Sequence, residues 1–177
     1  EFAANGKDRI TLAHVLSHTS GVFGWEPDKG MDGASALDVP ASTGALAEMK
    51  PFWEPGTAYL YHFITYGVLL GEVVRRACGK SLGRVFDEQI AKPLGLDMWI
   101  GLPEAHEGRV APHFRSAPPQ TEANLRRTFE GLGLDPDDRT IKALAQTMVA
   151  TEELIDILAT RAGRAADLPA ANAVGNA

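Results

Sequence analysis

Tyr61 is the residue whose surroundings most favour chemistry, because it lies between a predicted turn and a predicted helix. Pro55-Gly56 indicates the centre of a type II turn, since proline presets its own φ and glycine supplies a positive φ without steric cost. From Ile64 onward, apolar and small residues recur at spacings of three and four, which is typical of a buried helix face. We therefore expect Tyr61 at a helix start, where the partial positive charge of the helix would favour a phenolate.

Ser81 lies in a second pattern with possible chemistry, Gly79-Lys80-Ser81-Leu82-Gly83, which fits the Gly-x-Ser-x-Gly nucleophile elbow of α/β-hydrolases. That elbow requires a strand directly before the serine. Here a helix ending in Arg75-Arg76 is expected before Ser81, and a second helix is expected after it. The preferred interpretation is that Ser81 caps the second helix.

His14 and His18 are four residues apart, which is the spacing of the His-x-x-x-His pair of zinc hydrolases. Val15 occupies the place of the glutamate base, and no third ligand is apparent, so no metal site is predicted. A structural role is preferred, with His18 packed and hydrogen-bonded within its loop.

Four motifs together resemble those of the serine β-lactamase and penicillin-binding-protein-like family, in particular its class C β-lactamase and family VIII carboxylesterase branches. The first is similar to the family's Ile-Thr-x-x-x-Leu-Leu-x-His-Thr-Ser-Gly block, and the second matches Pro-Gly-x-x-x-x-Tyr up to Tyr61. The third resembles a glycine-containing helix, and the fourth resembles a Pro-Leu-Gly turn. They lie at residues 10–21, 55–61, 67–81 and 90–96.

The resemblance implies a mechanism and also shows what the chain lacks. In that family, the serine of a Ser-x-x-Lys motif forms an acyl-enzyme with an ester or amide, and a tyrosine at the position of Tyr61 relays protons. None of the serines in this chain is followed by lysine three residues later, and the family's Lys/His-x-Gly strand is absent as well. We therefore expect an internal fragment of a longer serine hydrolase, inactive by itself and needing no cofactor.

Phe63 departs from the family pattern, because class C β-lactamases carry asparagine two residues after the tyrosine. A phenyl ring has no hydrogen-bond donor for the acyl-amide oxygen of a β-lactam. A carboxylesterase acting on small or medium acyl esters is therefore the preferred function. His62 and Phe63 are expected at the rim of the site, whereas Tyr59 would point the other way in an extended segment.

Two other functions stay open for the complete protein. One is a non-catalytic binding or peptidoglycan-sensing relative that keeps the same fold. The other is β-lactamase or D-Ala-D-Ala peptidase activity, in which the substrate is an amide and not an ester. The presence or absence of a Ser-x-x-Lys motif in the complete protein separates the first of these from a hydrolase.

The composition limits the possible partners. With 177 residues, 45% of them hydrophobic, the chain is able to bury one core. Its net charge of −6 argues against nucleic acid as a partner. The family resemblance implies a small-molecule ester or amide as the substrate. No apolar run approaches the roughly 20 residues that span a bilayer. The oligomeric state and the compartment stay open, with a cytoplasmic location favoured.

The expected architecture is α/β (α+β), with this chain forming the mostly helical part of the transpeptidase-like fold. Residues 1–177 are expected to be one partial domain, truncated at both ends, and 103–134 a long surface excursion. A short strand is expected at 97–102, and Cys78 is expected to be buried. The expected helix boundaries are N-caps at Thr11, Ser42 and Ser81, starts at Asp135 and Thr151, and ends at Gly79 and Lys92-Pro93.

Overall fold

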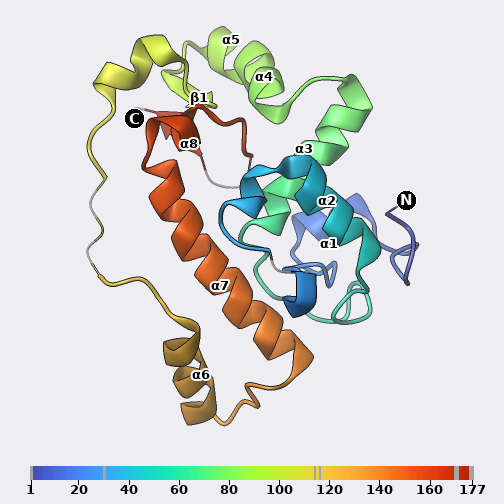
Figure 1. The fold of residues 1–177 in the computed structure, drawn as a ribbon. Coiled ribbons are helices and arrows are strands. Elements are labelled where there is room, and N and C mark those ends of the chain that lie inside the picture. The colour runs from blue at the N-terminus through green and yellow to red at the C-terminus, as the bar shows by residue number, and fades with distance from the viewer. Residues whose placement is uncertain (1, 30, 114, 116, 170–171, 176–177) are drawn as a thin grey trace.

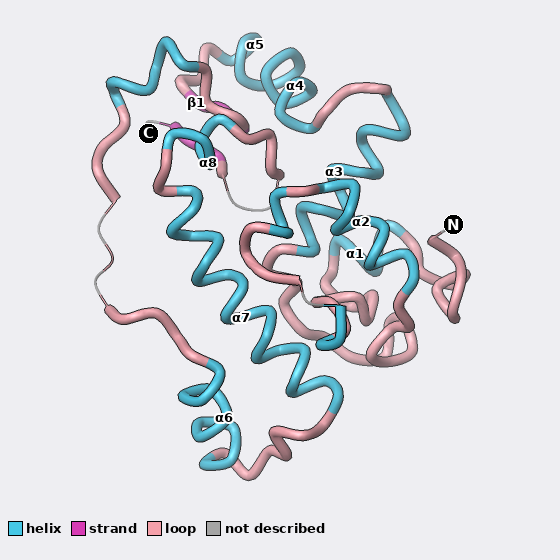
Figure 2. The backbone as a smooth tube through the Cα atoms, in the orientation of Figure 1, coloured by secondary structure: helices cyan, strands magenta, loops and turns pink. Residues whose placement is uncertain are grey.

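The computed structural model describes residues 2–29, 31–113, 115, 117–169 and 172–175. Helices make up most of the chain, and the strands form one small patch (Figures 1 and 2). The α-helices are α1 (Leu12–Leu16), α2 (Val39–Glu48), α3 (Thr65–Cys78), α4 (Leu82–Phe86), α5 (Lys92–Leu94), α6 (Glu122–Gly131), α7 (Arg139–Leu158) and α8 (Arg161–Ala165). Short 3-10 helices are η1 (Pro27–Lys29), η2 (Ser35–Leu37) and η4 (Glu104–Arg109), and η3 (Asp87–Ala91) is a π-helical turn.

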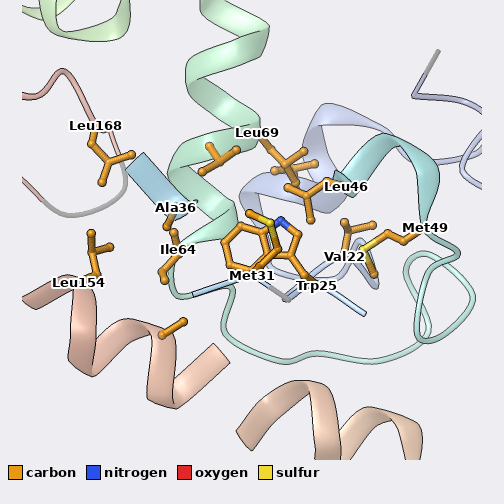
Figure 3. Close-up of a cluster of buried hydrophobic side chains, with 13 residues drawn as sticks. Val22, Trp25, Met31, Ala36, Leu46, Met49, Ile64, Leu69, Leu154 and Leu168 are labelled. Carbon is orange, nitrogen blue, oxygen red and sulfur yellow. The ribbon is translucent and has the colours of Figure 1, made fainter. Parts of the chain in front are cut away.

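The main hydrophobic core joins the two ends of the chain. Helices α1, α2 and α3 pack together on one side, and α7 runs diagonally past them (Figure 1). Side chains from all four helices and from the intervening loop meet in the cluster of Figure 3. A smaller cluster lies between α6 and α7. The buried members of the main cluster are Val15, Val22, Trp25, Met31, Ala36, Leu46, Met49, Ile64, Val68, Leu69, Ala150, Leu154 and Leu168.

The sheet consists of two short antiparallel strands, β1 (Met98–Ile100) and β2 (Ala173–Gly175), among the described residues. Met98 pairs with Gly175, and Ile100 pairs with Ala173. The short strand predicted at 97–102 is thereby confirmed in place, although β1 covers only Met98–Ile100. A mostly helical chain with a small sheet is also the expected part of an α/β fold, so the predicted fold class is confirmed.

Several helix boundaries follow from local sequence as expected. Thr11 caps α1, because its hydroxyl accepts a hydrogen bond from the backbone N–H of His14 at 3.2 Å. Ser81 caps α4 in the same way, through the backbone N–H of Arg84. Gly79 ends α3 in the left-handed conformation, with φ of +68°, after two arginines in the last turn. These three predictions are confirmed.

The predicted N-cap at Ser42 is wrong. Helix α2 begins at Val39, and its cap is Asp38, whose carboxylate accepts from the backbone N–H of Ala41 at 3.0 Å. Ser42 is buried inside the helix, where its hydroxyl donates to the carbonyl oxygen of Ser35 at 3.1 Å. A hydrogen bond to the preceding 3-10 helix η2 therefore satisfies the hydroxyl that was predicted to cap α2.

The predicted starts at Asp135 and Thr151 are also wrong. Asp135 accepts from the backbone N–H of Asp137 at 2.9 Å, which makes a turn and delays the helix until Asp138 caps α7. Thr151 does not restart a helix, because its hydroxyl donates to the carbonyl oxygen of Thr147 within α7 at 2.7 Å. Helix α7 therefore continues without a break to Leu158.

The predictions for Lys92-Pro93 and for Cys78 need correction as well. Helix α4 continues through the π-helical turn η3 into α5, and Pro93 is the second residue of α5. The helix ends two residues later, at Gly95, which has a φ of +63°. Cys78 is the last residue of α3 and is exposed, with its thiol donating to the carbonyl oxygen of Val74.

The segment 103–134 contains η4 and α6, and the described residues between them (110–113, 115 and 117–121) have no helix or strand and lie along the outside of the molecule (Figure 1). Arg115 connects this stretch to α7, through ion pairs with Glu152 and Asp156. Among the described helices, none combines the length and the apolar character that crossing a lipid bilayer requires.

Candidate active site

A turn and a loop hold the segment that carries Tyr61. The turn predicted at Pro55-Gly56 is confirmed, since Gly56 has a φ of +89° and the backbone N–H of Thr57 donates to the carbonyl oxygen of Glu54 at 3.0 Å. The backbone N–H of Gly56 also donates to the carbonyl oxygen of Thr19 at 2.9 Å. The loop after α1 and the segment before α3 therefore lie side by side.

Side chains alternate between solvent and interior along this segment. Tyr59, Tyr61 and Phe63 are 64%, 50% and 39% exposed, whereas His62 and Ile64 are 0% and 2% exposed. An alternation with a period of two is typical of extended backbone with one face packed. Tyr59 and Tyr61 are thus both directed to the surface, which contradicts the expectation that Tyr59 points the other way.

His62 is anchored in the interior by two hydrogen bonds of its ring. Nδ1 lies 2.6 Å from the carbonyl oxygen of Leu60, and Nε2 lies 2.7 Å from the hydroxyl oxygen of Ser20. A carbonyl oxygen only accepts, so Nδ1 carries the proton and Nε2 accepts from the Ser20 hydroxyl. Burial lowers the pKa of His62 to about 4, so the ring is neutral at neutral pH.

Ser20 was not singled out from the sequence, although it completes this arrangement. Its hydroxyl also accepts from the backbone N–H of Val22 at 3.1 Å, and its side chain is 0% exposed. A serine hydroxyl that donates to a histidine has the bonding of a nucleophile and its base. Because both side chains are fully buried, a substrate has no access to them, and the pair serves to hold the segment.

Tyr61 presents its phenol to the surface beside two other rings. Its ring lies 5.0 Å from the ring of Phe63, edge to face, and 4.7 Å from the ring of His18, centroid to centroid. Within the described part of the chain, no group hydrogen-bonds to the Tyr61 hydroxyl. The oxygen is therefore available to a group placed next to it.

The helix after Tyr61 begins slightly later than the sequence indicates. Helix α3 starts at Thr65, so Tyr61 belongs to the extended segment before the helix and not to its first turn. The field of a helix end acts mainly within the terminal turn. The expectation that Tyr61 lies at the helix start is therefore wrong, and the argument that the helix favours a phenolate there does not apply.

The three site residues expected from the sequence have different environments. Tyr61 and Phe63 are adjacent and exposed, as a site residue and a rim residue would be. His62 does not fit the rim position expected for it, because the alternation of the extended backbone turns its ring inward toward Ser20. Its role is to anchor the backbone on one side of Tyr61.

The two competing motifs have structural roles. Ser81 follows helix α3, so the strand required by a nucleophile elbow is not in front of it. His14 accepts from the backbone N–H of Thr11 through Nδ1 at 3.4 Å and completes the cap of α1. Among the described residues, no three His, Cys, Asp or Glu side chains are grouped so that they would hold a metal ion.

A cavity of about 450 Å³ lies between α1, α2 and α3, and Tyr61 is not among its lining residues. Val15, Leu69 and Val73 form much of its apolar lining. The carboxylate of Glu72 lies at its edge and is bonded to Arg75 and Arg76, with hydrogen bonds from Arg75 the main cause of a pKa lowered to about 2. The hydroxyl of Thr43, which also lines the cavity, donates to the carbonyl oxygen of Val39 at 2.7 Å, so neither the carboxylate nor this hydroxyl is a free base or an activated nucleophile.

A family model described as Beta-lactamase matches residues 1–177. Among curated proteins, the chain is 32% identical over 105 residues to the Esterase/beta-lactamase LipL of Mycobacterium tuberculosis. That match covers 59% of this chain and 24% of LipL.

Two solved structures extend the similarity to almost the whole chain. One, EstA from Arthrobacter nitroguajacolicus Rue61a, has a TM-score of 0.77 at 31% identity and is covered over 43% of its length. The other, a family VIII carboxylesterase, has a TM-score of 0.69 at 36% identity and is covered over 42% of its length. Each match includes 99% of this chain. Because it includes only 43% or 42% of the other protein, this chain spans less than half the length of either structure.

Proposed function

Because the chain belongs to the beta-lactamase family, we propose that it is the tyrosine-bearing part of a longer serine carboxylesterase. Of the homologues named above, LipL carries both the esterase and the beta-lactamase name, and one solved structure is described as a family VIII carboxylesterase. The observation that carries the proposal is the Tyr61 side chain: it is 50% exposed, no described residue hydrogen-bonds to its hydroxyl, and the buried ring of His62 anchors the segment next to it. The nucleophilic serine and its lysine are supplied by polypeptide outside these 177 residues.

In the proposed reaction, the serine oxygen attacks the ester carbonyl, its proton passes to the Tyr61 oxygen, and Tyr61 passes its own phenol proton on to the unprotonated amine of the lysine. Tyr61, with the lysine as its partner, then delivers a proton to the departing alcohol, which leaves an acyl-serine. Water attacks the acyl group and gives up a proton along the same route, and the serine oxygen recovers its proton as the acid leaves. The sum is one ester and one water converted to one acid and one alcohol, with Tyr61 regenerated.

Phe63 supports an ester over a β-lactam as the substrate. Its ring stands edge to face against Tyr61 and is 39% exposed, so it gives the site an apolar wall next to the phenol. An apolar wall suits an acyl chain, whereas the amide side chain of a β-lactam would lose a hydrogen-bond donor there. We therefore propose small or medium acyl esters as substrates.

The test is hydrolysis of a chromogenic short-chain ester by the complete protein and by its Tyr61→Phe variant. Loss of a general acid–base group should lower kcat by about 10²–10⁴. Tyr59→Phe is the matched control, because Tyr59 is also exposed and also contacts His18, and its turnover should stay near that of the unmodified protein. Unchanged turnover in Tyr61→Phe would remove Tyr61 from the mechanism.

The same assay addresses the two other functions. A non-catalytic binding relative predicts no turnover of any ester and no covalent labelling of the complete protein by a fluorophosphonate. A β-lactamase predicts faster turnover of a chromogenic cephalosporin than of the ester. The proposal predicts labelling of one serine, with the ester as the faster substrate.

A further inference from the structure

His18 has a backbone conformation that is uncommon for a residue with a side chain. Its φ is +58°, which places it in the left-handed region. Strained conformations of this kind persist where the surroundings require them, and they occur often at functional sites. Here the conformation turns both the carbonyl group and the ring of His18 toward the segment 60–62.

Both acceptors of His18 are used by that segment. Its carbonyl oxygen accepts from the backbone N–H of Leu60 at 3.3 Å, and its ring Nδ1 accepts from the backbone N–H of His62 at 3.2 Å. In extended backbone, alternate N–H groups point to the same side, so one residue bonds to both neighbours of Tyr61. Since Nδ1 accepts, the proton is on Nε2 and the ring is neutral.

The ring of His18 also contacts Tyr61 itself. The two ring centroids are 4.7 Å apart with an interplanar angle of 47°, and the ring of Tyr66 is also 4.7 Å away. Tyr66 lies in the first turn of α3, so His18 connects the Tyr61 phenol to the start of that helix. The rings of His62 and Tyr59 also face the His18 ring, at 5.3 Å and 6.0 Å between centroids.

We propose that His18 is the positioning residue of Tyr61, fixing the backbone on both sides of it and the direction of its phenol ring. This inference rests on the proposed function, because it assigns a reason for the placement of the proton-relaying hydroxyl. His18 itself exchanges no proton with the substrate. It acts by limiting the positions that the Tyr61 oxygen adopts.

Two substitutions of His18 separate the contribution of its hydrogen-bond acceptor from that of its ring. Asparagine keeps an acceptor near the position of Nδ1 and tolerates the left-handed region, but it has no ring. Phenylalanine keeps a ring but has no acceptor, and it is strained at this φ. We expect His18→Phe to lower kcat for the ester by about ten- to a hundredfold with little change in KM. His18→Asn should recover part of that loss.

The deciding measurement is a double-mutant cycle in the complete protein, combining each His18 substitution with Tyr61→Phe. If His18 acts through the Tyr61 hydroxyl, its substitution should change kcat by less than about twofold once that hydroxyl is gone. An equal loss in both backgrounds would overturn the inference, because general destabilisation acts whether or not the hydroxyl is present. His14→Asn, a similar change in the same region that does not contact Tyr61, should leave kcat unchanged.

A second readout does not depend on turnover. In protein with isotope-labelled tyrosine, the ring resonances of Tyr61 should shift in His18→Asn. The thermal midpoint of the same variant shows whether it is folded, so a folded variant with an unshifted Tyr61 ring contradicts the inference. A Tyr61→Phe variant with full activity contradicts the proposed function instead, whatever the resonances show.

Discussion

The imidazole of His62 exchanges all of its contact with water for two short hydrogen bonds. Its Nδ1–H is committed to the carbonyl oxygen of Leu60, and its Nε2 is committed to the hydroxyl of Ser20. A second proton would have to displace the Ser20 hydroxyl and place a charge in a buried position. The neutral ring is therefore part of the folded structure, and the charged ring is not.

This burial predicts a loss of stability in mild acid. Burial is the main cause of the lowered pKa of His62, from 6.5 to about 4, so between these values the unfolded chain binds the proton and the folded chain does not. The stability is complete above pH 6.5 and declines as the pH falls toward 4. At pH 5 the free energy of unfolding should be lower by about 2 kcal/mol than at pH 7.5 through this residue.

Urea unfolding at the two pH values measures this effect. His62→Gln should lower stability at pH 7.5 and show a smaller difference between the two conditions. The control is His113→Gln, since His113 is exposed, and it should keep the full pH difference of the unmodified chain. The same pH difference in His62→Gln as in the unmodified chain would assign the acid sensitivity to other groups, His18 among them, because burial also lowers the pKa of its ring.

At the scale of single elements, helix α7 begins three residues later than its sequence predicts, because Asp138 and not Asp135 caps it. The run Asp135-Pro136-Asp137-Asp138 offers three carboxylates as possible caps. The structure uses the last of them, whose Oδ1 accepts from the backbone N–H groups of Thr140 at 2.8 Å and Ile141 at 3.2 Å. Two donors of the first turn are thereby satisfied by one side chain.

The cap predicts different effects for two neighbouring substitutions. Asp138→Ala should lower the free energy of unfolding by about 1 kcal/mol, because two backbone donors lose their acceptor. Asp138→Asn keeps a capping oxygen and should recover most of that loss. Asp135→Ala is the comparison and should cost less, since its carboxylate accepts from one backbone N–H in a turn outside the helix. Equal losses for the two alanine variants would show that the helix begins earlier.

At the scale of the whole molecule, α7 ties the late part of the chain to its beginning. Arg139 pairs with Glu26 and donates to the carbonyl oxygen of Lys50 at 2.9 Å. Gly33 donates its backbone N–H to the carboxylate of Glu153 at 2.9 Å, at a place where a Cβ atom would lie 2.6 Å from the backbone nitrogen of Leu154. Leu154, 1% exposed, enters the same core as α1, α2 and α3 (Figure 3).

This packing predicts that the side chain of Leu154 contributes far more to the free energy of unfolding than that of Ile155, the next residue. Leu154→Ala should lower the free energy of unfolding by about 2–5 kcal/mol, because it leaves a cavity in the shared core. Ile155 is 37% exposed, so Ile155→Ala should cost less than about 1 kcal/mol. Urea unfolding of the two variants measures both values. A small cost for Leu154→Ala would mean that α7 contributes little to the core.

The features that the sequence predicted correctly are mostly set by residues close together in the chain. The turn at Pro55-Gly56, the caps at Thr11 and Ser81 and the end of α3 at Gly79 each depend on hydrogen bonds or φ values within four residues. The four motifs at residues 10–21, 55–61, 67–81 and 90–96 together predicted the family and the fold class. Turns, caps and helix ends of this kind are predictable from sequence because the residues that form the hydrogen bond or adopt the positive φ lie in the same short segment.

Only the tertiary structure decided the features that depend on residues far apart. The inward position of His62 follows from Ser20, 42 residues away, and from the side of the extended segment that packs. Two other hydroxyls have partners nearer in the chain that compete with a capping role: Ser42 donates to the carbonyl oxygen of Ser35 in η2, seven residues away, and Thr151 donates to that of Thr147 in α7, four residues away. A serine or threonine has the same hydroxyl at a cap or in a helix interior, so the sequence by itself leaves that choice to the partner that folding brings near.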